Sequence, residues 1–145
     1  NIPYTAYTYP HEEGVPVDGA TVARSLGQDP AAVFKTLVAR GATGGIYVFV
    51  VPVEESLDLK KAAKAVGEKS IAMIHVSEIN GLTGYVRGGC SPVGMKKLYP
   101  TVFHASALEQ EVIMVSAGKI GWQVALAPQA LMDLVRGKAA DIIAR

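Results

Sequence analysis

Alternating apolar and polar positions predict several short strands along this chain. Residues 5–9 are rich in threonine and tyrosine, which favour strands, and residues 70–74 form another short β-rich run. Two further pairs of β-rich runs are each separated by a short segment that contains glycine, which predicts two hairpins. These paired runs are residues 33–40 with 46–53, and residues 111–116 with 122–127.

Helical periodicity is clearest over residues 57–66. Apolar residues recur there at the i, i+3, i+4 and i+7 positions of one helix face, and Gly67 follows as a stop signal. The residues of that face are Leu59, Ala62, Ala63 and Val66.

Three other positions carry helix-start signals. Asp18 predicts the N-cap of a short helix that ends before Gly27, and Ser77 predicts the cap of another. Pro128 favours the start of a last helix, because proline suits the first helical turn. The apolar face of that helix is predicted to comprise Leu131, Leu134 and Val135.

Hairpins mixed with a few helices, without regular βαβ alternation, predict an α+β fold. We expect a mixed, mostly antiparallel sheet with flanking helices, which can curl into a barrel-like arrangement. The chain has 145 residues and half of them are hydrophobic, so a single domain over residues 1–145 can bury its own core.

Charge and cysteine content narrow the class of protein. A net charge of +1 is small for a general nucleic-acid binder, so an RNA partner would be contacted locally or delivered by another protein. The single cysteine excludes an internal disulfide and suits a reducing cytoplasm. The longest apolar run, residues 46–53, is too short to span a membrane.

The glycine-rich loop at residues 84–97 is the most informative segment. Glycine permits close approach of a backbone to a ligand, and Arg87, Lys96 and Lys97 supply a basic rim. The loop therefore suits an anionic ligand, although a tight turn between strands uses the same residue types. A phosphate-binding P-loop is excluded, because Met95 stands where that motif requires lysine.

Lys35 is the second informative residue. In a strand it shares one face with Val33 and Leu37, while Phe34 and Val38 occupy the other. Because neither face is polar, this lysine either extends to solvent from an edge or points into a cavity, where it would be a ligand clamp.

Other chemically capable residues give weaker signals. The lysines of residues 57–66 form either a solvated face or a contact surface for RNA phosphates. Cys90 is either a nucleophile or a small buried residue. The histidines lack metal-ligand spacing, so a metal site is not expected; they are His11, His75 and His104.

Taken together and in order, several segments resemble the YbaK family of trans-editing aminoacyl-tRNA deacylases. The matching segments are residues 7–11 (YTYPH), 33–37 (VFKTL), 59–64 (LKKAAK), 84–97 and 115–121 (VSAGKIG). The resemblance is greatest to the subgroup that hydrolyses Cys-tRNA(Pro). It implies a mixed β-barrel domain similar to the editing insertion of bacterial prolyl-tRNA synthetases. It also implies no metal or organic cofactor, and as partners the acceptor end of mischarged tRNA(Pro) and prolyl-tRNA synthetase.

The resemblance also implies roles for individual residues. Tyr9, Lys35, Gly88 and Ser116 match the family's functional positions, and the loop that contains Gly88 and Gly89 matches its substrate-binding loop. In the Cys-specific subgroup the substrate's own thiol attacks the ester, so the protein mainly orients the reacting groups.

In that mechanism Lys35 would hold the terminal adenosine as a compact cation, and backbone N–H groups of the loop would stabilise the developing oxyanion. Two alternatives stay open: an editor of Ala-tRNA(Pro) or another aminoacyl-tRNA, and a non-catalytic module that binds tRNA acceptor ends or prolyl-tRNA synthetase.

Overall fold

The computed structural model describes residues 5–8, 30–84, 92, 99–116 and 122–144. Its strands are β1 (Thr5–Thr8), β2 (Phe34–Gly41), β3 (Ile46–Pro52), β4 (Ile71–Met73), β5 (Thr101–His104), β6 (Ile113–Ser116), β7 (Trp122–Leu126) and β8 (Lys138–Ala140). Its helices are α2 (Leu59–Val66), α3 (Val76–Thr83) and α4 (Pro128–Val135), with short 3-10 turns η1 (Pro30–Ala32) and η2 (Ala105–Glu109). The predicted α+β class is confirmed.

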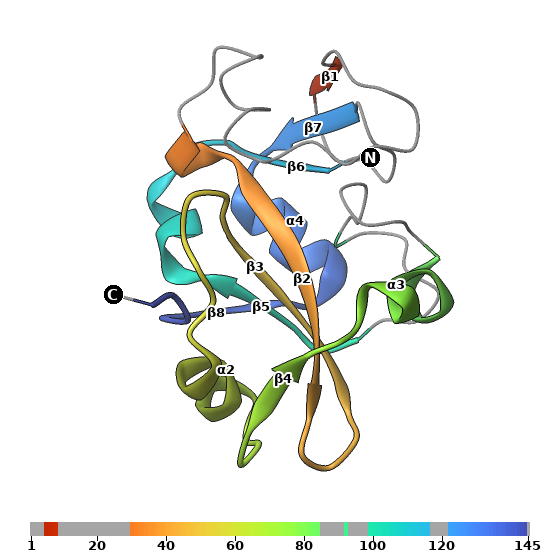
Figure 1. Ribbon diagram of the computed structural model, residues 1–145. Coiled ribbons are helices and arrows are strands. Elements are labelled where there is room, and N and C mark those ends of the chain that lie inside the picture. Colours follow the sequence, from red (N-terminus) through yellow and green to blue (C-terminus); the bar gives the residue numbers. More distant parts are fainter. Residues whose placement is uncertain (1–4, 9–29, 85–91, 93–98, 117–121, 145) are drawn as a thin grey trace.

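The strands form two sheets. In Figure 1 the strands of the smaller sheet lie above helix α4, and β2 and β3 of the larger sheet run past the helix. The smaller sheet is antiparallel in the order β1-β7-β6. The larger sheet has the order β4-β2-β3-β5-β8; it is antiparallel among β4, β2 and β3, and parallel where β5 joins β3 and β8. A mixed and mostly antiparallel arrangement is therefore confirmed. The described strands form open sheets, so the barrel-like closure is not confirmed.

The larger sheet is covered on both faces, which explains the apolar character of β2 and β3. On one face Phe34, Val48 and Val50 pack with α4 and with strands of the smaller sheet. On the other face Ala39 and Phe49 pack with α2 and the C-terminal segment. Alternation along the two strands thus divides their side chains between two separate apolar clusters.

Both predicted hairpins are confirmed, as β2 with β3 and as β6 with β7. The predicted strands at residues 5–9 and 70–74 are confirmed as β1 and β4. Helix α2 is confirmed as well: Asp58 Oδ1 accepts from the N–H groups of Lys60 and Lys61 at 2.9 and 3.0 Å. The helix ends at Gly67, whose φ of 74° explains the need for glycine.

Two helix predictions need correction. The N-cap of α3 is His75 rather than Ser77, and the Glu78 carboxylate accepts from the His75 N–H at 3.0 Å. Helix α4 begins at Pro128 as predicted, but Leu134 is 50% exposed while Met132 is buried. The buried face of α4 comprises positions 128, 131, 132 and 135, which follow the i, i+3, i+4, i+7 spacing of one helix face. The helix predicted after Asp18 lies outside the described residues.

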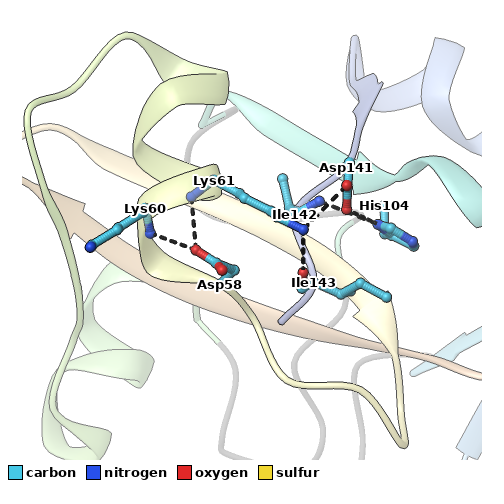
Figure 2. Close-up of polar contacts among 7 residues, drawn as sticks. All are labelled: Asp58, Lys60, Lys61, His104, Asp141, Ile142 and Ile143. Atoms are coloured by element: carbon cyan, nitrogen blue, oxygen red, sulfur yellow. Dashed lines mark hydrogen bonds and ion pairs between the residues drawn. The ribbon is translucent and has the colours of Figure 1, made fainter. Parts of the chain in front are cut away.

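The C-terminal segment, residues 141–144 after β8, completes the cluster around α2 (Figure 2). Ile142 is fully buried, its carbonyl accepts from the Asp58 N–H at 2.8 Å, and its N–H donates to His104 Nδ1 at 3.3 Å. Lys61 Nζ lies 3.2 Å from Asp141 Oδ2 and 3.0 Å from the Ile143 carbonyl oxygen. Lys61 therefore anchors this segment, and the predicted lysine face has a structural role at that position.

Lys60 and Lys64 are exposed on the same helix, and Figure 2 shows Lys60 pointing away from the C-terminal segment. Among the described helices, none has the length and apolar character needed to cross a membrane.

Candidate active site

The two sheets meet at a parallel bridge between Val33, just before β2, and Met114 on β6. Val33 and Met114 are buried there together with Ala125 of β7, and these three residues form a small apolar cluster. Strands β2 and β6 remain in contact beyond the bridge. The cluster therefore fixes how three strands lie next to one another.

One step further along each strand, the same face becomes polar. Two residues past Val33 is Lys35, two past Met114 is Ser116, and Ser116 is the register partner of Gln123 on β7. Because side chains on a strand return to the same face every second residue, these three belong to the face of the small apolar cluster. We call Lys35, Ser116 and Gln123 the polar layer.

The polar layer is poorly accessible to water. Ser116 is 8% and Gln123 is 6% exposed, and Lys35 is half-buried. Lys35 pairs with Val51 on β3, whereas β4 pairs with β2 only at residues 39–41. At Lys35, therefore, β2 has β3 on one side and β6 close to the other. Lys35 is thus half-buried on an interior strand, and its role as a ligand clamp stays a prediction.

Within the part of the chain that the structure describes, three buried side-chain polar atoms have no hydrogen-bond partner: Thr36 Oγ1, Ser106 Oγ and Gln123 Oε1. Such atoms are uncommon in folded proteins and each calls for a reason. Ser106 belongs to η2. Thr36 follows Lys35 directly, and Gln123 lies within the polar layer. Thr36 therefore belongs to the opposite face of β2, and of the three atoms only Gln123 Oε1 belongs to the polar layer.

Described residues on both sides of the glycine-rich loop are held by contacts with helix α3. Helix α3 ends at Gly84 with φ of 87°, and Arg40 of β2 holds this helix through an ion pair with Glu78 at 2.9 Å. Tyr99 Oη donates to the Leu82 carbonyl oxygen at 2.7 Å, which joins the far end of the loop to α3. The fold therefore fixes the two stems of the loop relative to each other.

The structure gives positions for some of the predicted site residues, and their roles stay predictions. It brings Lys35 and Ser116 onto neighbouring strands, as a shared site requires. Tyr9, Gly88 and Gly89 lie outside the described residues, although Tyr9 directly follows β1, whose Tyr7 is the register partner of Gln123.

Gln123 was missed by sequence reasoning. The available signal was the one used for Lys35, a polar residue inside an otherwise apolar strand. Within the described ranges, no three His, Cys, Asp or Glu side chains are grouped so that they could hold a metal ion.

Comparison with known proteins identifies the family. A model of the aminoacyl-tRNA editing domain matches residues 17–134. The chain belongs to the aminoacyl-tRNA editing domain family. A curated relative from Enterococcus faecalis, named "Putative Cys-tRNA(Pro)/Cys-tRNA(Cys) deacylase EbsC", is 45% identical over 141 residues. The alignment covers 97% of this chain and 85% of that relative. The chain is accordingly an aminoacyl-tRNA deacylase.

Solved structures agree with the fold of an editing domain. A crystal structure described as "a putative trans-editing enzyme for prolyl tRNA synthetase" has a TM-score of 0.85 at 25% identity. The match covers 98% of this chain and 87% of the chain in that structure. The hypothetical protein APE2540 has the same TM-score at 22% identity, covering 98% and 92%. The second match shows the fold alone, while family membership rests on the sequence comparisons.

Proposed function

We propose that this editing domain deacylates Cys-tRNA(Pro), the product of mischarging by prolyl-tRNA synthetase. The main observation in support is the position of Lys35. It is half-buried on an interior strand, next to the strand that contains Ser116. The name of the 45% identical relative from E. faecalis supports cysteine as the acyl group. Reaction in the cytoplasm, where mischarged tRNA is formed, is part of the proposal.

Lys35 is the proposed clamp for the substrate. An ammonium group on a flexible stem is a compact cation that suits a phosphate or the ester region of the terminal adenosine. Partial burial strengthens its interaction with an anion, because water screens the charge less there. Tyr9 and Ser116 supply hydroxyl groups, and the N–H groups near Gly88 and Gly89 face the acyl group in this proposal.

The proposed chemistry uses the thiol of the substrate. The cysteine sulfur attacks the carbonyl carbon of its own ester, the bond from that carbon to the ribose oxygen breaks, and the ribose oxygen takes up the proton that the thiol loses. The products are free tRNA and a cyclic thioester of cysteine, which water then opens. The protein contributes orientation, which alone accounts for large accelerations of intramolecular reactions.

A direct test compares Cys-tRNA(Pro) with Ala-tRNA(Pro) in the same deacylation assay. We expect the Cys ester to be cleaved faster, because alanine lacks the attacking sulfur, and a trapped cyclic thioester among the early products. Faster cleavage of the Ala ester would show an Ala-tRNA(Pro) editor instead. Release of free cysteine, with no cyclic product under trapping conditions, would contradict assistance by the thiol.

Prolyl-tRNA synthetase is the proposed protein partner, since the net charge of +1 gives this chain little general attraction for tRNA. We expect added synthetase to raise kcat/KM for Cys-tRNA(Pro) at physiological salt. An unchanged kcat/KM over a range of synthetase concentrations would indicate that the domain acts on tRNA alone.

A further inference from the structure

Gln123 is a buried amide whose oxygen has no donor among the residues that the structure describes. Its side chain is 6% exposed, and Oε1 has no hydrogen-bond partner. Leaving a buried acceptor unpaired costs a folded protein about 1–3 kcal/mol, so such an atom is a natural place for a ligand's donor. Its neighbours in register are Ser116 on β6 and Tyr7 on β1, and the small apolar cluster lies one step away.

The order of the strands separates Gln123 from Lys35. Lys35 lies on β2, Ser116 on β6 and Gln123 on β7, so β6 stands between the lysine and the glutamine. Neighbouring strands are about 4.8 Å apart, which puts the backbones of Lys35 and Gln123 roughly 10 Å from each other. The two residues therefore lie on different strands, from which they can contact different parts of one bound aminoacyl ester.

We propose that Gln123 Oε1 accepts a hydrogen bond from the α-ammonium group of the bound aminoacyl ester. This inference rests on the proposed function and names a residue that holds the end of the substrate opposite to Lys35. The α-ammonium group is the strongest donor that an aminoacyl group carries, because hydrogen bonds from charged donors are about twice as strong as neutral ones. A thiol is only a weak donor.

The consequence is that two residues bind the aminoacyl ester at opposite ends. Lys35 holds the ester or phosphate end, and Gln123 holds the amino end. Together they fix the rotation about the bond between the carbonyl carbon and the α-carbon. Rotation about the bond between the α-carbon and the β-carbon brings the sulfur near the carbonyl carbon, and the rotation fixed by the two residues sets the direction from which the sulfur meets the carbonyl plane. Gln123 therefore acts on the step that orientation accelerates.

The test pairs two variants with two substrates. Gln123→Met keeps the volume of the side chain but removes the amide, whereas Gln123→Glu keeps an acceptor at the same place. The substrates are Cys-tRNA(Pro) and 3-mercaptopropionyl-tRNA(Pro), which retains the thiol and lacks the amino group. We expect Gln123→Met to lower kcat/KM about 10- to 100-fold on the Cys ester and to leave the desamino ester unchanged. Gln123→Glu should retain activity on the Cys ester.

Two outcomes would overturn the assignment. Equal losses on both substrates would show that Gln123 does not contact the amino group. Gln123→Glu could also lose as much activity as Gln123→Met while circular dichroism shows both variants to be folded. That result would show that a hydrogen-bond acceptor at position 123 does not support activity. Failure of the unaltered protein to cleave Cys-tRNA(Pro) would instead refute the proposed function, and that result needs no Gln123 variant.

Discussion

At one end of β2, Gly41 lies against the carboxylate of Glu68, which accepts hydrogen bonds from Thr43 Oγ1 at 2.5 Å and Tyr47 Oη at 2.6 Å. At the other end, Lys35 lies in the polar layer, where Gln123 Oε1 is buried without a partner. Both ends place polar side chains beside an apolar cluster. We call the Glu68 end the closed end and the Lys35 end the open end.

The difference between the two ends separates stability from function. A hydrogen-bond network whose members satisfy one another makes the structure rigid, and it leaves nothing for a ligand to complete. A buried acceptor without a donor lowers stability and is retained when a substrate supplies the donor. We therefore expect changes at the open end to alter turnover, and changes at the closed end to alter unfolding.

The largest predicted effect is at Lys35. Lys35→Ala should lower kcat/KM for Cys-tRNA(Pro) by at least about 100-fold, because a preorganised charge next to the ester is lost. Lys35→Arg should also be impaired, since a planar guanidinium does not replace a compact ammonium. Deacylation kinetics measure this effect, and a variant that keeps most of its activity would remove Lys35 from the mechanism.

The largest predicted effect on folding is at Ile142, in the cluster around α2. Ile142→Ala should lower the free energy of unfolding by about 2–5 kcal/mol, because it leaves a cavity beside a fully buried position. The matched control is Leu134→Ala, at an exposed leucine, which should change the free energy by less than about 0.5 kcal/mol. Urea denaturation distinguishes them, and equal destabilisation would contradict the observed burial.

Acid should weaken the closed end before the open end. Hydrogen bonds from Thr43 and Tyr47 hold the pKa of Glu68 below its ordinary 4.5. The hydrogen bond from Arg40 lowers the pKa of Glu78 in the same way. A lowered pKa in the folded state contributes stability above pH 4.5 that is lost as the pH falls through the folded value.

Glu68→Gln should therefore show a shallower loss of stability than the unaltered protein below about pH 4.5. Glu109→Gln, at an exposed position in η2, is the control and should follow the unaltered protein. Identical acid profiles for all three proteins would contradict a role for the Glu68 network.

Alkali gives the complementary test at Tyr47. The hydrogen bond to Glu68 and burial raise the pKa of Tyr47 above its ordinary 10.0. A raised pKa in the folded state contributes stability below pH 10.0 that is lost as the pH rises through the folded value. Tyr47→Phe should flatten the decline of stability above pH 10.0, measured by thermal unfolding at each pH. A decline as steep as that of the unaltered protein would exclude this contribution.

The smallest predicted effect concerns the ion pair that holds the C-terminal segment. Lys61 and Asp141 are both partly exposed, so Lys61→Met should lower the free energy of unfolding by no more than about 1 kcal/mol. Lys60→Met, on the exposed side of the same helix, should have no measurable effect. A larger loss from Lys60→Met than from Lys61→Met would reverse the assigned roles.

Sequence patterns predicted the elements whose signals are local. The hairpins, α2 and the start of α4 follow from alternation, from helical periodicity that ends at Gly67, and from Pro128, all of which act within a few residues. Strands β5 and β8 were missed because they are short and pair in parallel with distant segments. Their existence depends on tertiary contacts that a short window of sequence does not contain.

The same limit applies to the site. Lys35 and Ser116 were predicted from a polar residue in an apolar run and from family resemblance, but their adjacency depends on the bridge between Val33 and Met114. Gln123 shows the limit most clearly. Its residue type is unremarkable, and only the register between β6 and β7 reveals a buried acceptor opposite Ser116.

The most direct test of a substrate site at the open end compares Lys35→Met with Lys61→Met. Each variant removes one half-buried lysine, the first from the polar layer and the second from the C-terminal anchor. For both we would measure kcat/KM on Cys-tRNA(Pro) and the free energy of unfolding. We predict that Lys35→Met loses turnover and keeps its stability, whereas Lys61→Met keeps turnover. Equal turnover by the two variants would contradict a substrate site at the Lys35 end.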